Sequence, residues 1–161
     1  MSPRARAATY TATQVVLWVV VLPGVVLYGE AGSLTPDWRP WPGLVLAAVA
    51  AAAGVALLRS GGRSLAGAGV GLFGVAPGPV LVEAGLYRYL RHPMDAGVVV
   101  LAAVGPLALE LRQAWVVTVA AIVYLVAGYE PLEERRLLEE FGDDYRDYRS
   151  RVPRWLPREP A

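Results

Sequence analysis

The sequence predicts an all-α integral membrane protein with about four transmembrane helices, a short re-entrant or interfacial segment, and a cytoplasmic C-terminal helix and tail. The 161 residues are 55% hydrophobic and 18% charged, with a mean hydropathy of +0.41, whereas a soluble domain has about 25% charged residues. Several uncharged stretches are long enough to cross a bilayer. Of 15 basic and 14 acidic residues, 16 lie in the last 32 positions, so the charge gathers at one end of the chain.

The first predicted span covers residues 9–28, which contain no charged side chain. At 1.5 Å per residue, a helix of this length crosses the hydrocarbon core of a bilayer. Basic residues precede it, as in a signal peptide, but the apolar stretch is too long and no small-residue cleavage site follows it cleanly.

The second predicted span covers residues 43–58, whose many alanines and glycines favour close packing against another helix. The polar sequence Arg59-Ser-Gly-Gly-Arg63 is expected to end it. Residues 65–82 are apolar but contain five glycines and two prolines, which indicates a short re-entrant or interfacial segment.

The third and fourth predicted spans cover residues 94–109 and 114–129, and Pro106 is expected to kink the third. Arginines are more frequent at the N-terminus and in the second loop than in the other loops. The positive-inside rule therefore predicts that both termini and the second loop lie in the cytoplasm.

The stretch from 85 to 97 (GLYRYLRHPMDAG) contains the only histidine of the chain, His92. Two arginines and two tyrosines precede it, and Pro93 follows at a position suited to the first residue of a helix. The unpaired N–H groups and the dipole of that helix would face this polar cluster, an arrangement that suits an anionic or polar ligand.

The segment 130–157 begins as a continuation of the fourth helix, with a bend at Pro131 and an end at Gly142. Glu134 falls on the apolar stripe of this helix and Glu133 lies beside it. Two interpretations are open: acids that face a ligand, or a solvated amphipathic helix. The second would carry the exposed pairs Arg135–Glu139 and Arg136–Glu140.

Composition excludes several classes of site and partner. The chain has no cysteine, which excludes disulfides, thiolate metal sites and cysteine nucleophiles. A net charge of +1 argues against nucleic acid as a partner. No metal site is predicted.

Two motifs then carry a family resemblance. The first motif comprises Gly85, Tyr87, Arg91, His92, Pro93, Met94 and Gly97. The second comprises Glu133, Glu134, Leu137, Phe141, Gly142, Tyr145, Tyr148, Val152, Pro153 and Pro157. In this order around a hairpin of spans, they resemble the isoprenylcysteine carboxyl methyltransferase and phospholipid methyltransferase superfamily. The resemblance extends over about half of the chain.

The resemblance implies a single domain, residues 1–161, in a bacterial inner membrane that it crosses several times. It implies methyl transfer from S-adenosylmethionine, which leaves S-adenosylhomocysteine, to a lipophilic or amphiphilic acceptor at the cytoplasmic face. The implied cofactor-binding residues, in segments 85–97 and 130–157, are Tyr87, Arg91, His92, Pro93, Met94, Asp95, Gly97, Glu133 and Glu134. Glu134 and Arg91 are expected to be catalytic.

The chain departs from the family pattern at two places. Asp95 replaces a tyrosine, either because an acid favours the start of a helix or because the pocket differs. The arginine expected just before the glutamate pair is absent, which argues against a carboxylate acceptor bound in the same way. O-, N- and S-methylation therefore stay open. One alternative is a phosphatidylethanolamine N-methyltransferase, and another is a non-catalytic protein that binds lipid or a partner.

Overall fold

The computed structural model describes residues 41–70, 80–109 and 114–156, and these residues form helices and turns but no strand. The predicted all-α class is therefore confirmed for this part of the chain. The predicted first span, 9–28, lies outside the described residues.

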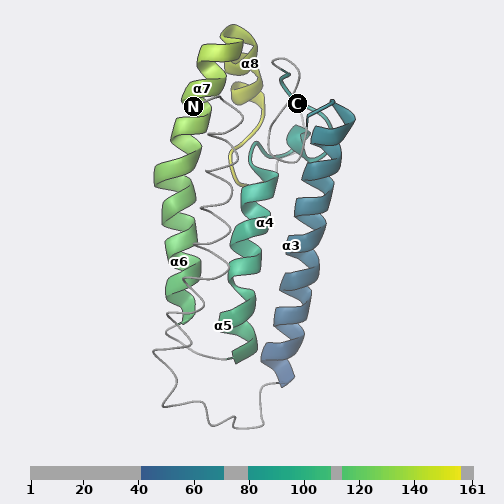
Figure 1. The fold of residues 1–161 in the computed structure, drawn as a ribbon, viewed down its shortest axis with the longest axis vertical. Coiled ribbons are helices and arrows are strands. Elements are labelled where there is room, and N and C mark those ends of the chain that lie inside the picture. The colour runs from purple at the N-terminus through teal and green to yellow at the C-terminus, as the bar shows by residue number, and fades with distance from the viewer. Residues whose placement is uncertain (1–40, 71–79, 110–113, 157–161) are drawn as a thin grey trace, which may run out of the picture.

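Helix α3 extends from Trp41 to Gly67, nine residues beyond the predicted second span (Figure 1). The prediction that Arg59–Arg63 ends this helix is wrong, and Leu65 belongs to α3. The two glycines of this sequence lie within the helix, and α4 packs against the first of them: a Cβ on Gly61 would lie 2.8 Å from Cγ of Met94. Half of the predicted re-entrant segment, residues 71–79, lies outside the described residues.

The third predicted span is two helices, α4 (Pro93–Ala102) and α5 (Val104–Leu109), with a break at Ala103. Pro106 has no N–H group to donate to the carbonyl of Ala102, four residues earlier. The hydroxyl of Thr118, on α6, donates to that carbonyl at 3.0 Å instead. The expected irregularity at Pro106 is therefore present, and a neighbouring helix satisfies the freed carbonyl.

The fourth predicted span is one continuous rod with the segment that follows it. Helix α6 (Trp115–Val123) passes through a π-helical turn, η4 (Tyr124–Tyr129), into α7 (Glu130–Phe141). The N–H of Glu130 donates to the carbonyl of Leu125, five residues earlier, just before Pro131. Gly142, with φ of 55°, ends α7 as predicted.

Two helices, Pro42–Gly67 and Trp115–Phe141, are long and apolar enough to cross a membrane, and a shorter apolar helix covers Pro93–Ala108. Apolar side chains such as Val49 and Val116 lie about 60% exposed on the outer faces of α3 and α6, as contact with lipid would require. The number of four spans stays a prediction.

Helix α3 packs against α4 and α5, and α4 packs in turn against α6 (Figure 1). At the centre of the α3–α4 contact, a Cβ on Gly54 or on Gly97 would lie 3.1 Å from the other residue's carbonyl oxygen. Only glycine permits this approach of two backbones. The close packing predicted from the small residues of the second span is confirmed.

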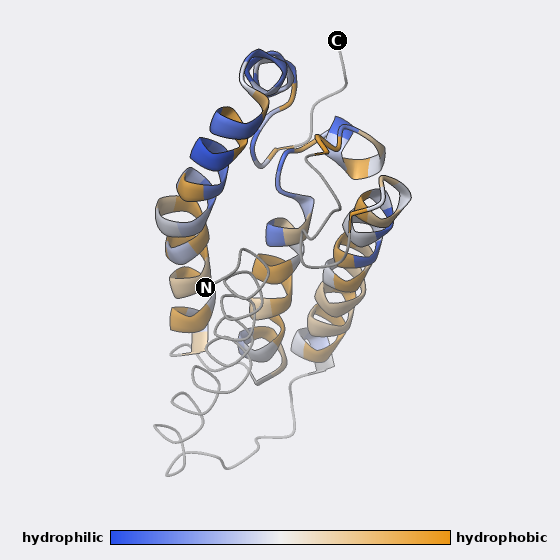
Figure 2. Ribbon diagram, turned by 45° about the horizontal axis from the view of Figure 1, so that its top comes forward, coloured by the Kyte–Doolittle hydropathy of each residue, from blue (hydrophilic) through white to orange (hydrophobic). Residues whose placement is uncertain are grey.

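Hydrophilic residues gather at one end of the helices, on α7 and on α8 (Asp143–Arg151), as Figure 2 shows. Gly142 reverses the chain so that Tyr145, Tyr148 and Val152 form a small core against the apolar stripe of α7. The 3₁₀ helix η2 (Gly85–Arg88) lies at the same end, and so do the segments that carry the candidate site.

Candidate functional site

The imidazole of His92 lies at the centre of a cluster of carboxylates. His92 is the residue just before α4 and is only 6% exposed. Its Nδ1 lies 3.5 Å from Oδ2 of Asp95 and 3.6 Å from Oε2 of Glu133, and its Nε2 lies 3.4 Å from Oε1 of Glu134. The fold therefore brings together the lone histidine and two glutamates more than forty positions away.

The surroundings of His92 keep its ring protonated. Burial disfavours the charged imidazolium, but the hydrogen bonds and negative charges of Glu133 and Glu134 outweigh it and raise the pKa of His92 to about 9. At neutral pH both ring nitrogens therefore carry protons and donate toward carboxylates. His92 is built to hold negative groups in place, and it does not have a free lone pair with which to accept a proton.

Glu134 receives further positive charges from two other segments. Nη1 of Arg91 donates to Oε1 of Glu134 at 2.6 Å, in a contact that is only about a tenth exposed on either side. Arg154, which follows α8, and Arg149, on α8, lie 3.8 and 3.9 Å from the same carboxylate. Such partly buried, charge-assisted contacts are stronger than surface ion pairs.

The solvated-helix interpretation of α7 fails at its predicted ion pairs. Neither Arg135–Glu139 nor Arg136–Glu140 forms in the part of the chain that the structure describes, although all four residues lie within it. Glu134 points inward to His92 and Arg91, as the interpretation of ligand-facing acids requires.

Two hydrogen bonds fasten the tail to the segment around His92. The hydroxyl of Tyr148 donates to the carbonyl of Tyr87 at 2.8 Å, and the N–H of Arg91 donates to the carbonyl of Pro153 at 3.0 Å. Burial and the charges of Glu133 and Asp95 raise the pKa of Tyr87 above its usual value, so this phenol stays neutral beside the cluster.

Of the other predicted cofactor residues, Met94 and Gly97 face α3 and belong to the helix packing. Met94 packs on Gly61, and a Cβ on Gly97 would lie 3.0 Å from Cγ of Leu58 on α3. Pro93 is buried at the first helical position, and Asp95 occupies the third. That position is where an acid favours the helix dipole, and Asp95 also contacts His92.

Sequence reasoning missed two charged residues of the site, Glu130 and Arg154. Glu130 is fully buried, at 0% exposure, and Nε of Arg154 lies 2.5 Å from its Oε2. A signal was present, because Glu130 precedes Glu134 by four residues and therefore shares its helix face. The position of Arg154 beside them depends on the path of the chain after α8, which has no comparable sequence signal.

Unsatisfied polar atoms concentrate in the same two segments. Within the described residues, every buried side-chain nitrogen or oxygen that lacks a hydrogen-bond partner belongs to Arg91, Glu130, Tyr145, Arg154 or Trp155. Both donors and acceptors are among them. Buried groups of this kind are usually paired, and here some of them adjoin one another, as Nε of Arg154 adjoins Oε2 of Glu130. A polar ligand with groups of both sorts is one partner that would complete their hydrogen bonding.

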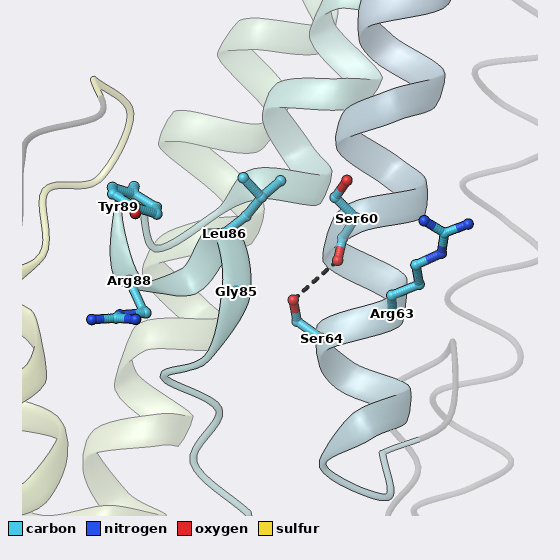
Figure 3. A pocket seen from close by; sticks show the side chains of 7 residues that line it. All are labelled: Ser60, Arg63, Ser64, Gly85, Leu86, Arg88 and Tyr89. Carbon is cyan, nitrogen blue, oxygen red and sulfur yellow. Dashed lines mark hydrogen bonds between the residues drawn. The ribbon is translucent and has the colours of Figure 1, made fainter.

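The side chains of the cluster around His92 contact one another directly. Two open surface cavities, of about 380 and 470 Å³, are lined by described residues, and neither is lined by His92 or by the glutamates. The smaller lies between α3 and η2, where Ser60, Ser64 and Leu86 face one another and Arg63 points away (Figure 3). The predicted hollow between His92 and the glutamates is therefore closed by their direct contacts.

Part of the cluster also resembles a site for a divalent cation. Ligand atoms of His92, Asp95 and Glu133 lie within 4.8 Å of one another, a grouping that the sequence analysis did not predict. A metal needs an imidazole nitrogen with a free lone pair. Nδ1 of His92 faces Asp95 and Glu133 and its Nε2 faces Glu134, so a cation bound by His92, Asp95 and Glu133 would have to replace the proton on Nδ1.

Comparison with known proteins gives one informative match. The chain is 39% identical over 74 residues to methanethiol S-methyltransferase 1 of Bradyrhizobium diazoefficiens. The aligned stretch covers 45% of this chain and 24% of that relative, so the chain spans well under two thirds of its length. No family model matches the chain, and no solved structure does.

Proposed function

We propose that this protein is a membrane methyltransferase that binds S-adenosylmethionine between the His92 segment and the glutamates of α7. The observation that carries the proposal is the convergence of His92, Arg91, Glu133 and Glu134 at the charged end of two membrane-length helices. The methyltransferase name of the 39% identical relative supports the same class of reaction.

The charges of the cluster fit this cofactor. S-adenosylmethionine has a cationic sulfonium, a cationic ammonium and an anionic carboxylate, so its site needs acids and cations together. The cluster supplies Glu130, Glu133 and Glu134 beside Arg91 and the His92 imidazolium. The unsatisfied buried donors and acceptors in the same place are further partners for a ligand with groups of both kinds.

When bound, the cofactor supplies an activated methyl group on sulfur. The protein's own contribution is to hold two reactants in line and to exclude water, which accounts for much of the catalysis of such a displacement. Arg91 and His92 fix the carboxylate of Glu134, so the acid is positioned before the ligand arrives. In this mechanism we expect Glu134 and Arg91 to contact the reacting end of the cofactor.

We propose a thiol as the acceptor, because the relative is named for methyl transfer to methanethiol. A thiol reacts as the thiolate, so its proton must leave before transfer. Glu133 is the acid best placed to take it, since it is about one third exposed whereas Glu134 is held by Arg91. A lipophilic thiol would arrive from the bilayer, in keeping with the exposed apolar faces of α3 and α6.

Titration calorimetry with S-adenosylhomocysteine tests the class of protein. We expect the detergent-solubilised protein to bind it, and Glu134→Ala to weaken binding roughly tenfold or more, because Arg91 and His92 then lose their shared partner. Glu139→Ala is the matched control, since this exposed acid of the same helix makes no ion pair in the described structure. A folded protein that binds nothing would refute the methyltransferase and leave a non-catalytic lipid- or partner-binding protein.

Labelled S-adenosylmethionine identifies the acceptor. The protein is incubated in parallel with methanethiol and longer alkyl thiols, with phosphatidylethanolamine vesicles, and with a prenylcysteine. We expect label on the thiols. Label on the amine lipid would establish a phospholipid N-methyltransferase instead, and label on the prenylcysteine would establish a carboxyl methyltransferase.

A further inference from the structure

Glu130 is a buried acid whose charge is incompletely satisfied. Its side chain is 0% exposed, and within the described residues neither carboxylate oxygen accepts a hydrogen bond. Arg154 comes close, with Nε 2.5 Å from Oε2, but the N–H does not point at the oxygen, so the contact is an ion pair without a hydrogen bond. A buried charge is stable only with good geometry and full hydrogen bonding. This pair lacks both, and its retention therefore requires an explanation.

An irregular turn of the backbone sets the position of Glu130. It follows the π-helical turn η4, and its N–H bonds to the carbonyl of Leu125 in place of the usual fourth-neighbour carbonyl. Single π turns inside α-helices are frequent at functional sites. Glu130 also shares a helix face with Glu134, and its charge contributes to the raised pKa of His92, so it belongs to the same electrostatic cluster.

Arg154 lies between these two acids and is partly exposed to solvent. It lies 2.5 Å from Glu130 and 3.8 Å from Glu134, and its side chain is 30% exposed. The tail that carries it is fastened nearby by the bond from the N–H of Arg91 to the carbonyl of Pro153. Its guanidinium therefore fills the space between two carboxylates from the solvent side, which is where an incoming cation would have to lie.

We infer that Glu130 is a further ligand-binding residue, which receives a cationic group of the bound ligand, and that Arg154 neutralises it until the ligand arrives. The inference rests on the proposed function, and the ligand is then the S-adenosyl cofactor. One cation replaces another, so no covalent step or proton transfer is needed. Arg154 moves outward to the solvent that it already contacts, and the closed cluster opens.

Three ligands test the inference by calorimetry on the full-length protein in detergent. S-adenosylmethionine carries a sulfonium and an ammonium, S-adenosylhomocysteine carries the ammonium only, and 5′-methylthioadenosine carries neither. Glu130→Gln keeps the shape of the side chain and removes its charge. We expect this substitution to weaken the binding of S-adenosylmethionine roughly tenfold or more. The affinity for methylthioadenosine should stay within about twofold of that of the parent. An equal loss for S-adenosylhomocysteine assigns Glu130 to the ammonium, and a smaller loss assigns it to the sulfonium.

Arg154→Gln should change the affinity in the opposite direction. Because this substitution removes the competing cation, S-adenosylmethionine should bind more tightly than to the parent. Arg151→Gln is the matched control, since this tail arginine pairs with Glu83 and Asp147 away from the cluster. If Glu130→Gln does not fold, the double variant Glu130→Gln/Arg154→Gln, which has no uncompensated charge, must show the same selective loss.

Two results would overturn the assignment of Glu130. Unchanged affinities in Glu130→Gln would do so, and so would an equal loss for methylthioadenosine, since that indicates only a structural role. Both results leave the proposed function standing. A folded parent protein that binds none of the three ligands would refute the proposed function itself, and the inference with it.

Discussion

The charge of His92 makes the stability of the protein depend on pH. The pKa of this histidine is raised from its ordinary value of 6.5 to about 9. When folding raises the pKa of a histidine, the protonated ring stabilises the folded state fully at pH values below the pKa of the unfolded state. This stabilisation is lost as the pH rises through the pKa of the folded state. The interactions of His92 with Glu133 and Glu134 therefore stabilise the protein at pH 6.5 and below, and are lost progressively up to about pH 9.

The difference between these two pKa values corresponds to about 3 kcal/mol, an upper value for a group that is 6% exposed. His92→Asn is the reference variant, because asparagine also suits the residue before a helix but has no charge. The unfolding free energy of the parent should fall relative to that of His92→Asn by about 3 kcal/mol between pH 6 and pH 10. Thermal unfolding in detergent across this range measures it.

Because the chain has one histidine, NMR of protein labelled at histidine follows the same titration directly. We expect a midpoint near 9 in the parent and a lower midpoint in Glu134→Gln, which removes one of the two hydrogen-bonding acids. A midpoint between 6 and 7 in the parent, close to the ordinary histidine value, would refute the reasoning that the carboxylates outweigh burial. The reasoning would also be refuted if the unfolding free energies of the parent and of His92→Asn differed by the same amount at every pH.

Three further predictions concern the fold that holds the site. Thr118→Val should cost roughly 1–3 kcal/mol in unfolding free energy, because the carbonyl of Ala102 loses the hydroxyl that donates to it. Thr118→Ser, which keeps the hydroxyl, should retain most of that stability in the same denaturation assay. Gly97→Val should lower the thermal midpoint strongly, because its Cβ would lie 3.1 Å from a backbone oxygen of α3, and an unchanged midpoint would contradict the close approach of α3 and α4. Tyr148→Phe removes the bond to the carbonyl of Tyr87 and should cost about 1 kcal/mol. Faster hydrogen exchange at the backbone of α8 and the tail is its readout, and exchange equal to the parent would show that this bond does not hold the tail.

Sequence patterns predicted the helices better than their ends. Uncharged stretches located α3 and the rod that contains α6, because hydropathy follows from composition alone. The predicted end of α3 was wrong, because a glycine need not break a helix when a neighbouring helix packs against it, and the side chain of Met94 packs against Gly61. Helix α8 was not predicted either, because its tyrosines are buried against residues of α7, which they meet only because the chain reverses at Gly142.

What the sequence determined by itself was the apolar, helical character of the chain and the identity of the charged groups near its polar end. Motif order also indicated that His92 and the glutamates belong to one site, and the structure brings them within 3.4 to 3.6 Å. Only the tertiary structure decided that Glu130 and Arg154 join them, that Met94 and Gly97 turn toward α3, and that the cluster is closed by its own ion pairs. The physical reason is that hydropathy is a property of each segment, whereas the burial of a charge and its choice of partner depend on which segments pack together.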